Sequence, residues 1–109
     1  MPGPTTQPLY YVIFLTTTYT SLADAQERAP AEIAAHLARS QRLHEQGLVV
    51  MAGAFLDRPD EPLSTMVVCT SREAADDFIQ GDPFVRNGQV SAWHIREWGN
   101  MFAMREQGG

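Results

Sequence analysis

Short apolar runs alternate with polar and turn-forming segments along this chain. The first run is rich in aromatic and β-branched residues, which is typical of a buried β-strand. Two further runs are also apolar, a later segment at residues 89–98 alternates between apolar and polar positions, and turn signals bound these segments. The pattern therefore predicts four strands, at residues 9–15, 48–56, 63–69 and 89–98.

Two longer segments carry the start and stop signals of helices. Pro30 suits the first turn of a helix, where its missing N–H group costs nothing, and Gly47 is a common residue just after a helix end. These signals predict a helix over residues 30–46. Residues 70–73 have the Thr-x-x-Glu form of a capping box, which predicts a second helix that ends near Gly81.

The remaining segments predict connections. Residues 16–29 are polar and predict a loop with a short helical turn around residues 22–28. Residues 57–62 contain two prolines, which do not suit a central strand, so they predict a turn. Residues 82–84 predict another turn because Pro83 disfavours helical conformation in the residue before it. The order βαββαβ predicts an α+β, ferredoxin-like fold with a four-stranded antiparallel sheet.

Both faces of this sheet are predicted to be apolar. The second strand shows this alternation most clearly, with Leu48, Val50, Ala52, Ala54 and Leu56 on one face and Val49, Met51, Gly53 and Phe55 on the other. Two helices cover only one face of four strands, and the uncovered face would expose a large apolar patch. We therefore expect a homodimer that pairs two sheets face to face.

Length and composition indicate one small domain. The 109 residues suit a single two-layer core. We expect a flexible leader at residues 1–8, the domain at residues 9–102 and a tail at residues 103–109. No basic segment precedes an apolar stretch at the start, and no apolar run approaches the ~20 residues that span a bilayer, so we expect a cytoplasmic protein. The single cysteine, Cys69, lies in a predicted strand, and we expect it to pack there as an unreactive thiol and not to act as a nucleophile.

Charge excludes several classes of function. The formal net charge is −5, and the basic residues are scattered. Nucleic acids and anionic membranes attract concentrated positive charge, so we expect neither as a partner. Every basic side chain is Arg, which excludes a lysine Schiff base and a P-loop lysine.

A histidine lies on the face of the first helix that is expected to meet the sheet. Residues at three- and four-residue spacing share this face, namely Ile33, His36, Leu37, Ser40 and Leu43. Arg39 lies elsewhere, towards water. Histidine is the side chain best suited to moving protons near neutral pH. His36 is therefore either a proton-transfer group or a histidine at the edge of the core that binds backbone.

Asp82 allows two interpretations in the same way. An aspartate before Pro83 is a common turn cap, because its carboxylate accepts a backbone N–H. The same carboxylate can instead bind a histidine, fix its tautomer and raise its basicity. Such a pair can abstract a proton next to a carbonyl or protonate a leaving group.

Other candidate groups give weaker signals. His44 lies near the helix end and is expected to bind terminal carbonyls, and His94 lies in the last strand. The histidines lack the close spacing of a metal site, and no Gly-rich phosphate loop is present, so we expect neither metal nor cofactor. Four aromatic residues are candidates either for a pocket or for packing, namely Phe55, Phe84, Trp93 and Trp98.

Taken together, the motifs resemble those of the YciI-like (YCII-related) family of dimeric α+β-barrel proteins. The resemblance spans about residues 9–102. It rests on residues 10–14 (YYVIF), 36–39 (HLAR), 48–53, 73–75 (EAA) and 82–85 (DPFV), with Gly88 and Trp98. It departs from the family pattern at Gly53-Ala54, where Gly-Pro is usual. The loop between Thr16 and Pro30 is also longer than usual, so the resemblance does not extend to the choice of substrate.

The resemblance implies a ferredoxin-like fold, a sheet-to-sheet dimer and a site centred on His36 and Asp82. Members of the family include a dehydrochlorinase that acts on a chlorinated hydroxyquinol. We hypothesise a cofactor-free enzyme that uses this pair for elimination or isomerisation of a cyclic or phenolic small molecule. Residues expected to contact the substrate are Arg39, Ser40, Phe55, Phe84 and Trp98.

Two alternatives stay open at this point. The chain can be a non-catalytic dimer that binds a small ligand or assists a larger enzyme, because one fold hosts many functions. It can also be a cofactor-independent monooxygenase, with Trp93 or Trp98 near the substrate.

Overall fold

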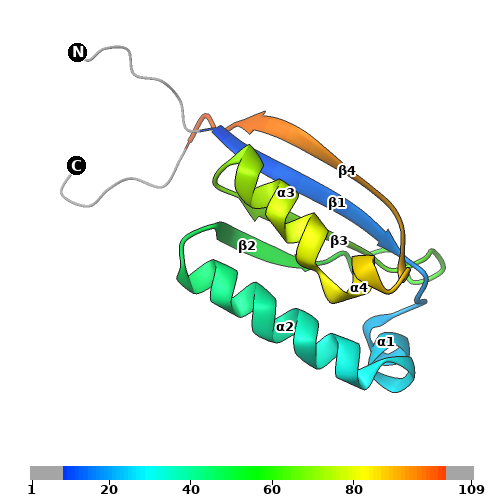
Figure 1. Cartoon of the computed structure of the whole chain (residues 1–109). Coiled ribbons are helices and arrows are strands. Elements are labelled where there is room, and N and C mark those ends of the chain that lie inside the picture. Colours follow the sequence, from blue (N-terminus) through cyan, green and yellow to red (C-terminus); the bar gives the residue numbers. More distant parts are fainter. Residues whose placement is uncertain (1–8, 103–109) are drawn as a thin grey trace, which may run out of the picture.

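Eight elements follow one another in the computed structural model, which describes residues 9–102 (Figure 1). The predicted leader at residues 1–8 and tail at residues 103–109 lie outside the described residues. The elements are β1 (Leu9–Thr17), α1 (Leu22–Arg28), α2 (Pro30–Glu45), β2 (Val49–Ala54), β3 (Ser64–Cys69), α3 (Arg72–Gly81), α4 (Pro83–Arg86) and β4 (Val90–Gly99).

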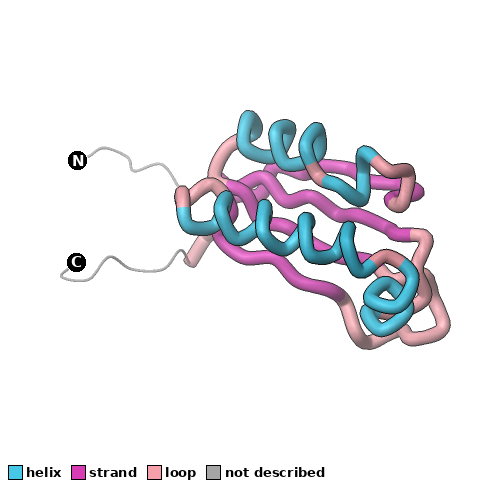
Figure 2. The backbone as a smooth tube through the Cα atoms, turned by 60° about the horizontal axis from the view of Figure 1, so that its bottom comes forward, coloured by secondary structure: helices cyan, strands magenta, loops and turns pink. Residues whose placement is uncertain are grey.

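The strands form one antiparallel sheet in the order β2-β3-β1-β4. The helices lie on one side of this sheet, with α3 above its middle and α2 alongside β2 (Figures 1 and 2). This arrangement confirms the predicted α+β, ferredoxin-like fold. Figure 2 also shows α1 beside one end of α2, where it lengthens the helical layer.

Strand pairing separates a helix-covered face of the sheet from an open face. On β1, Ile13 and Leu15 belong to the core beneath the helices, and Ile13 pairs directly with Val67 and Ile95. Because side chains alternate along a strand, Phe14 and the other intervening residues point to the open face. The core consists of Ile13, Leu15, Leu43, Val49, Val67, Cys69, Ala74, Ala75, Phe78 and Ile79. Only one of these residues comes from α2, so this helix packs on the sheet mainly through its C-terminal end.

One helix start agrees with the prediction and another differs from it. The short helical turn predicted around residues 22–28 is present as α1, and the Ser21 side chain caps it by accepting a hydrogen bond from Asp24 N. At α3 the predicted capping box places the start one residue early. Ser71 is the N-cap and accepts from Ala74 N at 3.0 Å, whereas the Thr70 hydroxyl donates to the carbonyl of Gly47.

The turn at Asp82 is present and leads into a four-residue helix. Asp82 is extended (φ −70°, ψ 129°), as expected for a residue before proline, and it separates α3 from α4. β2 is shorter than predicted, and Phe55 and Leu56 lie beyond its end as exposed residues. Within the part of the chain that the structure describes, no helix has the length and apolar character needed to cross a membrane.

Candidate functional site

A cavity of about 990 Å³ lies between α2 and the sheet. Its walls come from α2, β2, β3 and the segment after β1, and Asp82 and Phe84 at the start of α4 also line it. Most of the lining is aliphatic or aromatic, and a few polar side chains interrupt it, which is typical of small-molecule sites of this size. The polar lining side chains are Thr17, Tyr19, Gln26, His36, Ser40, Gln41, His44, Thr65 and Asp82.

His36 and Asp82 meet at this cavity. Nδ1 of His36 lies 2.5 Å from Oδ1 of Asp82, although the two residues are 46 positions apart. The Asp82 side chain is 2% exposed, whereas the His36 side chain is 26% exposed. The carboxylate is thus buried behind the imidazole, and the imidazole is the member of the pair that a ligand can reach.

The local fold fixes the carboxylate in this position. Asp82 follows directly on α3, and its Oδ2 accepts hydrogen bonds from the backbone amides of Phe84 (3.1 Å) and Val85 (3.3 Å) at the start of α4. A buried carboxylate needs such partners. Asp82 is therefore a turn cap, as one interpretation predicted, and its other carboxylate oxygen contacts His36.

Two phenylalanines fix the plane of the His36 ring. The Phe84 ring lies 4.8 Å from the imidazole between centroids, at an angle of 31°. The Phe78 ring meets the imidazole edge-on at 6.3 Å and 89°. With Nδ1 bound to Asp82, these contacts leave the imidazole little freedom to turn.

This geometry defines what the pair can do chemically. An ionised carboxylate only accepts hydrogen bonds, so it favours a proton on Nδ1 of His36. Nε2 is then the ring nitrogen left for a ligand in the cavity, with its lone pair free to take a proton. The arrangement is suited to general acid–base chemistry.

Of the residues expected to contact substrate, Phe84 and Ser40 line the cavity with His36, and Arg39 does not. The Arg39 guanidinium donates hydrogen bonds to the carbonyls of Asp77 (2.7 Å) and Phe78 (3.0 Å) in the last turn of α3. Its side chain is only 17% exposed, so the prediction that it faces water was wrong. Arg39 instead ties α2 to the end of α3, directly before Asp82.

The structure places Phe55 and Trp98 away from His36. Phe55 follows β2, is 44% exposed and borders a smaller surface pocket near Arg58. Trp98 pairs with Tyr10 at the far end of β4, with ring centroids 6.1 Å apart. Neither lines the cavity, and Trp93 does not line it either.

The other two histidines have packing partners. Nδ1 of His44 lies 2.8 Å from the carbonyl oxygen of Val49 on β2, so His44 binds a strand carbonyl and not the expected helix carbonyls. His94 stacks on Phe14 on the open face of the sheet, with ring centroids 5.1 Å apart. Across residues 9–102, no group of three or more His, Cys, Asp or Glu side chains is placed to hold a metal ion.

Sequence reasoning missed several polar residues of the cavity, among them Tyr19. Tyr19 lines the cavity from the segment between β1 and α1 and is 2% exposed. A lone aromatic residue within the polar segment 16–29 is a signal for burial. Cys69, by contrast, behaves as predicted: it is fully buried, and burial raises the pKa of its thiol to about 11.

Several solved structures share this fold. A 5-chloro-2-hydroxyhydroquinone dehydrochlorinase from Burkholderia phenoliruptrix, in complex with 2,5-dihydroxybenzoquinone, is 21% identical with a TM-score of 0.59, and the match covers 84% of this chain and 94% of that one. A protein from Nitrosomonas europaea, provisionally assigned as an antibiotic biosynthesis monooxygenase, is 9% identical with a TM-score of 0.58 and coverage of 94% and 99%. At such identities the similarity shows the fold alone.

Comparison with curated proteins finds no match. The model of one protein family, however, matches nearly the whole described domain, from residue 9 to residue 99. That span includes the strands, the helices and both members of the His36–Asp82 pair. This chain therefore belongs to the family of YCII-related domain proteins.

Proposed function

We propose that this protein is a cofactor-free enzyme that moves a proton on a cyclic or phenolic small molecule, in an elimination or an isomerisation. The observation that carries the proposal is the His36–Asp82 contact at the wall of a large, mostly apolar cavity. His36 is the general base and acid. Asp82 orients it and stabilises its charged form.

The chemistry balances without a cofactor. In an elimination, Nε2 of His36 takes a proton from carbon, the C–H electrons form a double bond, and the leaving group departs with its bonding electrons. In an isomerisation, His36 returns the same proton to a different carbon. The similar Burkholderia structure supports the first version, since that protein is a dehydrochlorinase bound to a dihydroxybenzoquinone. Ser40, one helical turn from His36, contacts an oxygen of the substrate.

The test is turnover in His36→Ala, Asp82→Asn and a control histidine variant. Chlorinated hydroxyquinols are screened for chloride release, and enolisable cyclic ketones for exchange of carbon-bound hydrogen in heavy water. We expect His36→Ala to lose about 100-fold or more of the rate, which is the usual contribution of general acid–base catalysis. His94→Gln, on the other face of the sheet, is the control. Unchanged turnover in His36→Ala would exclude the proposed role.

A second candidate is a non-catalytic module that binds a small ligand. It is favoured by the cap at α4, because two backbone amides account for the buried Asp82 carboxylate without any chemistry. In that case His36→Ala weakens ligand binding, and no screened compound is converted. A cofactor-independent monooxygenase is a third candidate for this fold, and oxygen uptake that depends on substrate is its measurement. A rate that is equal with and without oxygen excludes it.

We further propose that two copies of the chain pair through the open face of the sheet. Aromatic and apolar side chains gather there along β1 and β4, including Phe14 and the Tyr10–Trp98 pair. An apolar sheet face of this kind is stable in water when a second sheet covers it. The partner is a second copy, because the two-fold arrangement lets one patch cover itself.

A further inference from the structure

Tyr19 lines the cavity, and its buried hydroxyl has no hydrogen-bond partner within the described chain. Tyr19 is 2% exposed, so bulk water does not act as a hydrogen-bond partner for its hydroxyl. Most buried hydroxyls are paired, since leaving one unpaired costs free energy. An unpaired donor on a residue that lines a ligand-sized cavity is a group that a ligand can satisfy.

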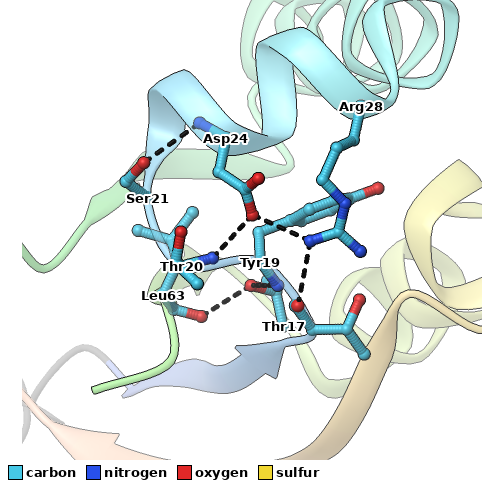
Figure 3. Close-up of polar contacts among 8 residues, drawn as sticks. Thr17, Tyr19, Thr20, Ser21, Asp24, Arg28 and Leu63 are labelled. Carbon is cyan, nitrogen blue, oxygen red and sulfur yellow. Dashed lines mark hydrogen bonds and ion pairs between the residues drawn. The ribbon is translucent and has the colours of Figure 1, made fainter. Parts of the chain in front are cut away.

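The segment after β1 holds this ring in place from several sides. The Tyr19 amide donates to the Thr17 hydroxyl oxygen at 3.1 Å, and its carbonyl accepts from Leu63 N at 2.9 Å. The Arg28 guanidinium carbon lies 4.9 Å from the ring centroid. Figure 3 shows the Arg28 side chain beside the Tyr19 ring. Asp24 fixes the guanidinium through a 2.8 Å ion pair. The ring is therefore pre-positioned, and binding a ligand with it orders little that is not already ordered.

One aromatic ring connects Tyr19 to the His36–Asp82 pair. The Phe84 ring meets the Tyr19 ring edge-on at 5.7 Å and lies 4.8 Å from the His36 imidazole. Tyr19 and His36 thus flank the same phenylalanine and line the same cavity. A ligand that packs on Phe84 can present one end to each of them.

The charges around the cavity select the kind of ligand. No arginine and no glutamate occurs among its lining residues, and the one lining carboxylate, Asp82, is already engaged by His36 and two backbone amides. A carboxylate or phosphate ligand would find no fixed positive charge there. Burial raises the pKa of Tyr19, so its phenol stays protonated at neutral pH and acts as a donor.

We propose that Tyr19 is a substrate-binding residue that donates a hydrogen bond to a carbonyl or quinone oxygen of an uncharged cyclic ligand. This inference deepens the proposed function and rests on it for the position of the ligand between Tyr19 and His36. When a proton leaves the carbon next to that carbonyl, negative charge develops on its oxygen. The Tyr19 hydroxyl then stabilises this charge, while His36 holds the proton.

The experiment compares three small probes of one shape by ligand-observed NMR titration. Acetophenone has an aromatic body and one carbonyl, ethylbenzene has the same body without oxygen, and benzoate carries a negative charge. Wild type should bind acetophenone more tightly than ethylbenzene or benzoate. Tyr19→Phe should weaken acetophenone binding about 3- to 10-fold, the size of one neutral hydrogen bond, and leave ethylbenzene binding unchanged. Tyr11→Phe is the matched control, because the Tyr11 hydroxyl binds Glu97 outside the cavity.

A second measurement needs no ligand. Because the Tyr19 hydroxyl has no partner to lose, the melting temperature of Tyr19→Phe should equal or exceed that of wild type. A lower melting temperature would show that the hydroxyl is a structural group and would overturn the inference. Equal binding of acetophenone and ethylbenzene by wild type, or equal weakening of both in Tyr19→Phe, would also overturn it. None of these readouts depends on turnover, so they stand apart from the His36→Ala test.

Discussion

The carboxylate of Asp82 joins two tasks, because Oδ1 contacts Nδ1 of His36 at 2.5 Å while Oδ2 caps α4. The orientation of the imidazole is therefore fixed by the same turn that ends α3. Substitutions at position 82 can therefore separate the helix cap from the contact with His36. Asparagine caps helices about as well as aspartate, whereas alanine does not.

Asp82→Asn should keep the fold and change the His36 tautomer. The asparagine carbonyl can cap α4, and its NH₂ group then faces Nδ1 of His36 as a donor. Nδ1 becomes the acceptor and Nε2 carries the proton, so His36 loses its function as a base towards the cavity. Two-bond ¹H–¹⁵N correlation spectra of the ring identify the tautomer. A proton that stays on Nδ1 would show that Asp82 does not set it.

The matched variant Asp82→Ala should lose both functions. Without the cap at α4, the free energy of unfolding should fall by about 1–2 kcal/mol, as measured by urea denaturation. Asp82→Asn should lie much closer to wild type. If both variants are equally destabilised, the His36 contact and not the cap provides most of the stabilisation.

Gly81 leaves the space that Arg39 occupies. A Cβ atom at position 81 would lie 2.5 Å from Nη2 and 2.6 Å from Cζ of Arg39. Gly81→Ala should therefore push the guanidinium off the α3 carbonyls and lower the free energy of unfolding by about 1 kcal/mol. In an Arg39→Ala background the same substitution should be neutral or stabilising, since alanine is the better helix former. A double-mutant cycle in urea measures this coupling, and additive effects would contradict it.

The order of the elements was predictable because most strands and helices carry local signals. Pro30 and Gly47 delimit α2 correctly within two residues, and Pro83 forces the extended conformation of Asp82. The start of α3 was misplaced because Thr70 and Ser71 are both good caps. The structure decides between them through a long-range contact, because the Thr70 hydroxyl binds the Gly47 carbonyl and Ser71 is left to cap the helix. The local sequence gives no sign of this contact.

The candidate site was predictable only in part, because helical spacing describes local positions and not long-range contacts. Helical spacing places His36 on the inner face of α2, and the family resemblance pairs it with Asp82. Arg39 was assigned to water because helical spacing describes only one neighbour of α2, the sheet, whereas the guanidinium reaches two carbonyls at the end of α3. Tyr19 was missed because its burial arises from long-range contacts with Leu63 and Phe84.

Cys69 should make stability fall at alkaline pH. Its thiol has an ordinary pKa of 9.0, and burial raises that pKa to about 11 in the folded protein. Below pH 9 both states keep the proton, so the full stability is present. As the pH rises from 9 to about 11, only the unfolded chain releases it, which favours unfolding by up to about 3 kcal/mol.

The variant Cys69→Ala isolates this effect from other titrating groups. Its absolute stability is lower because it leaves a small cavity, but its decline between pH 9 and pH 11 should be shallower than that of wild type. Urea denaturation at several pH values gives both curves. Parallel curves would mean that the thiolate is tolerated in the folded core.

The two tryptophans of β4 offer a matched test of the dimer. Trp93 and Trp98 are 46% and 47% exposed, but pairing places them on opposite faces. Trp93 lies opposite Leu15 of the helix-covered face, whereas Trp98 lies opposite Tyr10 of the open face. Trp98→Glu introduces charge into the proposed interface and should give a monomer by light scattering after size exclusion. Trp93→Glu should stay dimeric, and a monomeric wild type or an identical response of both variants would show that the open face is not the interface.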